Sequence, residues 1–162
     1  MILYPIVIVI HILSAIAWLS FLPIDYILRK SIRETQNITA KKELISIWLK
    51  TSNLLGIIGM AGILVTGIAM VSMNDYYSFF QFSMNHWLAT KQVFMVVIII
   101  STFAFLIPNA KKLAAELLST VKGESTFSTD IDGKVDKIGK ILSVINVLVL
   151  INLLLAVTHK YI

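Results

Sequence analysis

Apolar residues dominate four stretches of the chain, and polar residues collect between them. The stretches cover residues 2–28, 44–73, 87–108 and 138–159. Each is long enough to cross about 30 Å of hydrocarbon as a helix that rises about 1.5 Å per residue. The pattern therefore predicts one transmembrane domain, residues 1–162, with an all-α fold: an integral membrane four-helix bundle.

Two prolines predict a kink in the first of these helices and the end of the third. Pro23 lies near the end of the first stretch and is expected to kink it. Pro108, followed by Asn109, is expected to end the third stretch. The segment 109–137 contains the run GESTFSTDIDGK. It is then a long connection between helices, rich in turn-forming residues.

Composition agrees with a protein whose main solvent is lipid. Hydrophobic residues make up 57% of the chain, charged residues 14%, and the mean hydropathy is +0.86. No soluble domain of this size needs so much apolar surface. The chain has no cysteine, which excludes disulfides, cysteine-ligated iron–sulfur clusters and covalently attached c-type haem.

The net charge of +5 predicts membrane topology and no nucleic-acid partner. The first connection carries Arg29, Lys30, Arg33, Lys41 and Lys42, and the second carries Lys111, Lys112, Lys122, Lys134 and Lys137. The segment 74–86 has neither lysine nor arginine. Basic connections stay in the cytoplasm. We therefore expect a multi-pass protein of a bacterial inner membrane, with both termini on the outer, periplasmic side.

His11 is the strongest candidate for a functional residue. It lies inside the first apolar stretch, where an ionisable group is costly and marks a candidate site. The predicted topology places His86, Lys91 and His159 on the same outer side of the membrane. Trp18 follows His11 by seven residues and shares its helix face.

These residues favour a non-covalent haem b between facing helices. Neutral imidazole is a good iron ligand, and helix bundles hold porphyrins. His11 would be the metal ligand, and Lys91, His86 or His159 the second ligand or the partner of the propionates. Zinc or copper fits less well, because no two histidines lie three or four residues apart.

Two short motifs, HILSAIAW (His11 to Trp18) and HWLATKQVFMVV (His86 to Val97), resemble a known group. They are similar to the small four-helix membrane proteins that include the HemJ-type protoporphyrinogen oxidase and the CopD-like domain. In that group a tryptophan follows the first-span histidine by seven residues, and the third span often opens Trp-Leu-x-x-Lys. The resemblance implies that His11 and Lys91 serve haem b binding and the oxidation of protoporphyrinogen IX, with Lys91 as the catalytic residue.

Three functions stay open at this point. The first is a haem b redox protein, either a porphyrinogen oxidase or a small cytochrome b that accepts electrons from a quinol. The second is a structural or assembly subunit of a larger membrane complex or homo-oligomer, in which His11 merely bonds another helix, through Asn146 or Asn152. The third is a copper-handling protein of the CopD-like kind.

Overall fold

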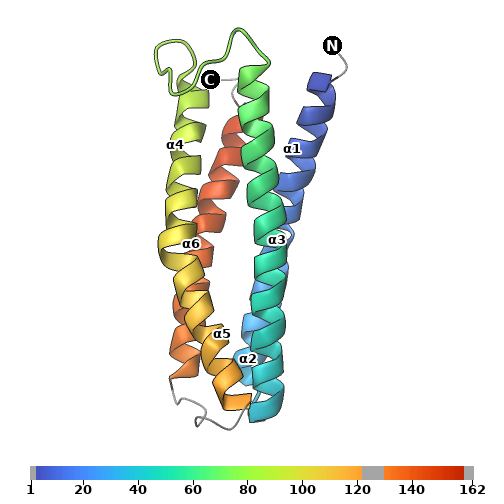
Figure 1. The fold of residues 1–162 in the computed structure, drawn as a ribbon, viewed down its shortest axis with the longest axis vertical. Helices are drawn as coiled ribbons and strands as arrows, with labels where there is room; N and C mark the ends of the chain where they lie inside the picture. The colour runs from blue at the N-terminus through green and yellow to red at the C-terminus, as the bar shows by residue number, and fades with distance from the viewer. Residues whose placement is uncertain (1–2, 122–129, 159–162) are drawn as a thin grey trace.

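The computed structural model describes residues 3–121 and 130–158, and every element in these ranges is helical. The elements are α1 (Leu3–Leu19), α2 (Phe21–Glu34), α3 (Ile38–Ser72), α4 (His86–Ser101), the π-helical turn η1 (Thr102–Leu106), α5 (Ile107–Val121) and α6 (Ile131–Thr158). They form long helical rods that run side by side (Figure 1). Four continuous runs in the described ranges are long and apolar enough to span a membrane, which confirms the predicted all-α class.

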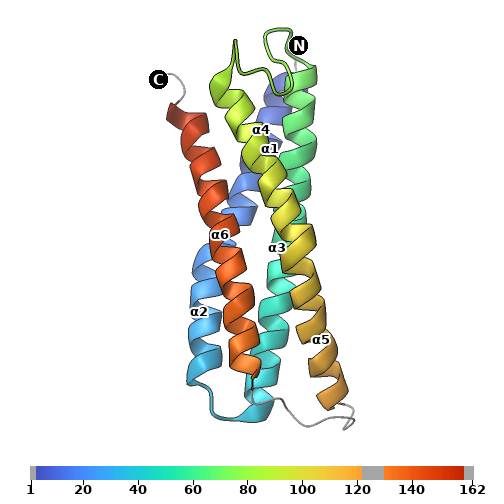
Figure 2. The ribbon, with the colours of Figure 1, turned by 90° about the vertical axis from the view of Figure 1, so that its left-hand side faces the viewer.

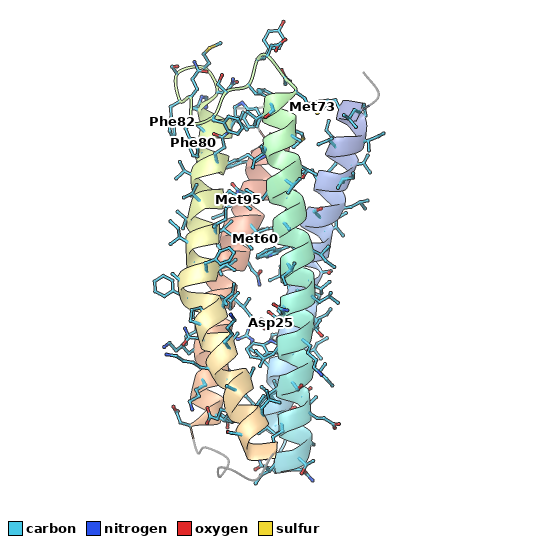
Figure 3. The ribbon with its side chains drawn as sticks, in the orientation of Figure 1. Asp25, Met60, Met73, Phe80, Phe82 and Met95 are labelled. Atoms are coloured by element: carbon cyan, nitrogen blue, oxygen red, sulfur yellow. The ribbon has the colours of Figure 1, made fainter. Side chains whose placement is uncertain are left out.

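The bundle has two distinct ends (Figures 1 and 2). At the first, which we call the aromatic-loop end, α1 and α4 begin, α3 and α6 end, and the segment 73–85 connects α3 to α4. Tyr76, Phe79, Phe80 and Phe82 of that segment are exposed, and Figure 3 shows Phe80 and Phe82 at this end. At the second, the basic end, α2 and α5 end and α3 and α6 begin.

The half of the bundle at the basic end has a packed apolar core. It is built by α2, the first turns of α3, α5 and the first turns of α6 around Phe21, Ile32, Ile45, Trp48, Leu113, Leu117, Ile131, Val135, Ile138 and Leu142. The 35 residues of α3 span about 52 Å at the usual rise, well beyond the hydrocarbon thickness of about 30 Å. We therefore expect part of this half to stand in water.

A buried ion pair lies within this core, and Figure 3 labels its acidic member, Asp25. Asp25 is 3% exposed and accepts two hydrogen bonds from Arg29, at 3.0 and 2.6 Å. Trp48 Nε1 donates a third at 2.8 Å. The guanidinium packs against Gly139 of α6, where a Cβ would lie 2.6 Å from Arg29 Nη1. Asp25 and Arg29 are four residues apart in the sequence, a spacing that predicts their pairing on one helix face, and the structure confirms it.

The half at the aromatic-loop end divides into two helix pairs. α1 packs against α3, and α4 packs against α6, while α1 makes only a few contacts with α6. Figure 1 shows the two pairs side by side, with α3 and α1 on one side and α4 and α6 on the other. From Leu3 to Leu13 and from Leu150 to Thr158, no described residue is buried.

The two prolines expected to redirect a helix differ in their effect. The helix is interrupted at Ser20, one turn before Pro23, as expected for a proline that removes one backbone donor. Pro108, in contrast, does not end the third span. It lies inside the continuous helical run His86–Ser119, directly after η1 (Thr102–Leu106), and the wider π-helical turn makes room for a residue that lacks a backbone N–H.

The predicted long connection over 109–137 is also wrong in its described part. α5 extends to Val121 and α6 begins at Ile131, and residues 122–129 lie outside the described residues. Leu113 and Leu117 are spaced one helical turn apart and both enter the core. The apolar period of a helix therefore outweighs the turn-forming residues on either side of it.

Candidate functional site

A hydrogen bond between α1 and α3 fixes the orientation of the His11 ring. His11 is half-buried, and its Nδ1 lies 2.8 Å from Thr66 Oγ1. The Thr66 hydroxyl donates its own hydrogen to the Gly62 carbonyl. Because a hydroxyl has a single hydrogen, Thr66 must accept from Nδ1–H. The neutral ring then carries its lone pair on Nε2, the nitrogen left to meet a ligand.

Small residues let α1 approach α3 closely beside this bond. A Cβ on Gly59 would lie 2.7 Å from Trp18 Cβ, and a Cβ on Gly62 would lie 2.7 Å from Ser14 Cβ. At Gly67 the nearest atom would be His11 Cε1, at 3.6 Å. Close approach of helices through small residues is typical of membrane interiors. The stripe therefore sets the face of α1 that meets α3, and with it the position of His11.

Lys91 of α4 lies across the bundle from this pair. It is half-buried, and its Nζ is 5.7 Å from the centroid of the Trp87 ring, within cation–π range. No carboxylate forms an ion pair with Lys91 within residues 3–121 and 130–158. A positive charge therefore lies in this half of the bundle with no carboxylate partner among the described residues.

Two side-chain amides next to Lys91 have buried atoms without a hydrogen-bond partner among the described residues. Asn152 of α6 donates to the Lys91 carbonyl at 3.3 Å, but its Oδ1 is unsatisfied. Gln92 accepts from the Phe80 N–H at 2.5 Å, but its Nε2 is unsatisfied. Buried polar atoms are nearly always hydrogen-bonded in native proteins. Both atoms therefore mark positions for water or for a polar ligand.

The structure separates the other predicted site residues from this group. His86 is exposed at the first position of α4. His159 lies outside the described residues. Trp18 is buried, and its Nε1 donates to Asn146 Oδ1 at 2.9 Å, about two helical turns deeper than His11 by sequence. His11 and Lys91 thus lie in the same half of the bundle, with Trp18 about two helical turns deeper than His11.

Thr66 and Gln92 are site residues that the sequence pattern alone does not single out. Thr66 lies in a run of small residues. The sequence alone does not distinguish a threonine that packs two helices together from one that bonds to a histidine. Gln92 directly follows Lys91. The sequence signal that could have identified it is a second polar residue at that depth in an apolar span.

The donor set does not suit a metal ion that needs three or four protein ligands. Within the described ranges, no three histidine or acidic side chains come together in a way that could hold a metal ion. Zinc and copper sites use such clusters. A porphyrin, in contrast, supplies four of the six iron ligands itself, so a single well-placed imidazole meets its first requirement.

No protein-family model, no curated protein and no solved structure matches this chain. The functional argument therefore depends on the residues and their geometry.

Proposed function

We propose that this chain is a haem b-binding membrane redox protein with His11 as an axial ligand. The supporting observation is the bond between His11 and Thr66, which places the ring hydrogen on Nδ1 and leaves the Nε2 lone pair for iron. Ligand histidines in metalloproteins are commonly oriented through their second nitrogen in this way. A bound haem would supply one-electron chemistry, and the chain would supply its orientation and electrostatics.

The neighbouring residues fit a porphyrin in several respects. Lys91, which forms no ion pair within the described ranges, offers a cation for a propionate or an amine as the second ligand. Asn152 and Gln92 add an acceptor and a donor that the described residues leave unsatisfied. The few contacts between the α1–α3 and α4–α6 pairs leave their interface as the place for a flat group. In this proposal the basic end faces the cytoplasm of a bacterial inner membrane, and the reductant is a porphyrinogen such as protoporphyrinogen IX or a quinol.

One observation also favours a purely structural role. A bond from His11 to a threonine on the adjacent helix is what a histidine that only links two helices would make, as in an assembly subunit of a membrane complex. The two functions differ in whether Nε2 of His11 has a ligand. They therefore differ in the absorption spectrum of the purified protein.

The test is spectroscopic. The full chain is expressed with added haem precursor, purified in detergent, and examined by reduced-minus-oxidised difference spectra and the pyridine haemochrome assay. We expect b-type bands in the native protein and in His86→Ala, which removes an exposed imidazole, and no bands in folded His11→Ala. Absence of b-type bands from the native protein, or unchanged bands in His11→Ala, would overturn the proposal. Co-purification of stoichiometric partners without haem would support the assembly subunit.

A further inference from the structure

A second polar site lies deeper in the bundle, on the other side of Trp18 from His11. It is a cavity of about 90 Å³. Its walls come from α1, α2, α3, η1, α5 and α6, and its polar lining residues are Trp18, Trp48, Ser52, Asn53, Thr102 and Asn146. Met60 lines it as well, and Figure 3 shows Met60 and Asp25 one above the other in the bundle interior at this level.

Asn146 gives the cavity an unmet hydrogen-bond requirement. Its side chain is 3% exposed. Its Oδ1 accepts from Trp18 Nε1, while its Nδ2 has no partner in the described part of the chain. A buried amide nitrogen without an acceptor is costly. The cavity therefore lacks an acceptor oxygen opposite this nitrogen.

The remaining walls specify what could carry that oxygen. No charged side chain of the described residues lines the cavity, so its occupant is uncharged. Both indole N–H groups are already used, by Asn146 and by Asp25, so Trp18 and Trp48 offer the occupant only apolar surface. Flat rings pack well on such surfaces.

The cavity also has a second polar wall and a lateral opening. Asn53 and Ser52 of α3 stand on the opposite side from Asn146 of α6, and Asn53 and Ile57 are exposed on the surface of α3. Leu54, Ile57 and Ile58 are exposed on α3 at this depth, and we expect this apolar surface to face lipid. A molecule dissolved in the membrane can therefore enter without crossing water.

The π-helical turn η1 shapes the wall next to this opening. It spans Thr102–Leu106, and both of these residues line the cavity. Thr102 uses its hydroxyl within its own helix, donating to the Ile98 carbonyl. Single π-helical turns inside α-helices occur frequently at functional sites, and here the turn widens the helix where it borders the space.

We propose that this cavity binds the ring of a membrane-soluble quinone. A quinone ring is flat and uncharged, and carries carbonyl acceptors on opposite sides, one for Asn146 Nδ2 and one for the Asn53 and Ser52 wall. A closed apolar cavity of about 150 Å³ holds a benzene ring. The present space, which is smaller but open to one side, accommodates a ring once the flexible Met60 side chain moves. The site does not depend on haem at His11, because Trp18 separates the cavity from that residue.

The test uses the fluorescence of the tryptophans that line the cavity. Full-length protein in phosphatidylcholine nanodiscs is titrated with a short-chain ubiquinone, which quenches nearby indoles. We expect saturable quenching in the native protein and binding weaker by about tenfold in Asn146→Leu, which removes one hydrogen bond in a dry site. Ser143→Ala is the control, since it removes a polar group of α6, three residues from Asn146, that bonds only within its own helix and does not line the cavity.

Linear, non-saturable quenching of equal slope in all three proteins would show partition into the lipid only and would overturn the proposal. Equal affinity in Asn146→Leu and Ser143→Ala would also overturn it. If Asn146→Leu does not fold, Ile57→Trp tests the same site from its mouth. Its added indole is expected to be quenched with the same saturation curve, and absence of saturation there counts against the site. The haem spectrum of each sample is recorded in parallel, so that failure of one proposal is distinguished from failure of the other.

Discussion

The half of the bundle at the basic end is held by a large cluster of buried apolar side chains. Toward the aromatic-loop end the apolar cluster is smaller, formed by Trp18, Ile98, Ile145 and Val149, and small residues and single polar bonds join α1 to α3. Ile32, Ile45 and Trp48 in the first are fully buried. The second has instead the contact of Ser14 with Gly62 and the bond of His11 to Thr66. The same helices run through both halves, so we attribute the difference in packing to the solvent around each half.

Solvent explains this difference. In water, burial of apolar surface drives packing, so the part of the basic half that extends past the hydrocarbon gains from a large aliphatic core. In lipid, an exposed valine or leucine costs nothing, and helices associate through close contacts and hydrogen bonds. The lipid-facing half can therefore keep polar groups such as Lys91 and Gln92 near its centre without giving up much packing energy.

The largest effect should follow from breaking the ion pair of the basic half. In Asp25→Asn the buried Arg29 loses its partner, and we expect the free energy of unfolding to fall by about 3 kcal/mol, the lower end for a buried pair because the Arg29 side chain keeps 19% exposure. Unfolding of the purified protein in mixed micelles, followed by circular dichroism, measures it.

The exposed pair of Arg33 with Asp136 provides the control for this change. These side chains are 56% and 40% exposed, and such surface pairs add little to stability. Asp136→Asn should therefore unfold almost as the native protein does. Equal losses in the two variants would contradict the argument that burial makes the Asp25–Arg29 pair the more important of the two.

A medium effect should follow from separating α1 and α3. In Gly59→Ala the new methyl group would meet Trp18 Cβ at 2.7 Å and its Cα at 3.0 Å, so the helices must move apart. We expect a loss of about 1–3 kcal/mol in the free energy of unfolding, as for other overpacked interiors. Gly56→Ala is the control: no described atom lies within 4 Å of its new Cβ, and alanine is the better helix former by up to about 1 kcal/mol. A loss in Gly56→Ala as large as in Gly59→Ala would contradict the close-contact role of the stripe.

The sequence predicted this architecture where one local pattern was sufficient. The four apolar stretches appear as four membrane-length helical runs of the described residues, and the spacing of Asp25 and Arg29 predicted their pairing. Buried amides in membrane helices usually bond across helices, and Asn146 does so, with Trp18 as its partner. In each case the relevant information lies within one helix, or in a residue type that has few alternatives in lipid.

The sequence failed where the outcome depends on how two helices face each other. Proline usually ends a helix, but here η1 absorbs Pro108 and α5 continues, because Leu113 and Leu117 bury their side chains in the core. The sequence also did not identify the hydrogen-bond partner of His11. Thr66, Asn146 and Asn152 were all polar residues of adjacent spans, and only the contact between α1 and α3 selects Thr66.

The smallest effect on stability, and the most specific effect on function, should come from the bond that orients His11. Thr66→Val keeps the shape of the side chain and removes the hydroxyl, so we expect a loss of about 1 kcal/mol in the free energy of unfolding. Haem affinity should fall by about tenfold, as for other residues that orient a metal ligand. Thr66→Ser keeps the hydroxyl and should retain both properties. Haem titration followed at the Soret band measures the affinity.

This pair of variants decides between the two roles of the lipid-facing half. If His11 only links α1 to α3, Thr66→Val changes stability alone, and the titration shows no difference from Thr66→Ser. If the half instead holds a cofactor, the change in affinity is larger than the change in stability, because the hydroxyl then determines which nitrogen carries the lone pair as well as how tightly two helices pack. A small effect of Thr66→Val on the free energy of unfolding, together with a large effect on the haem spectrum, is expected only if this loosely packed half of the bundle binds a ligand.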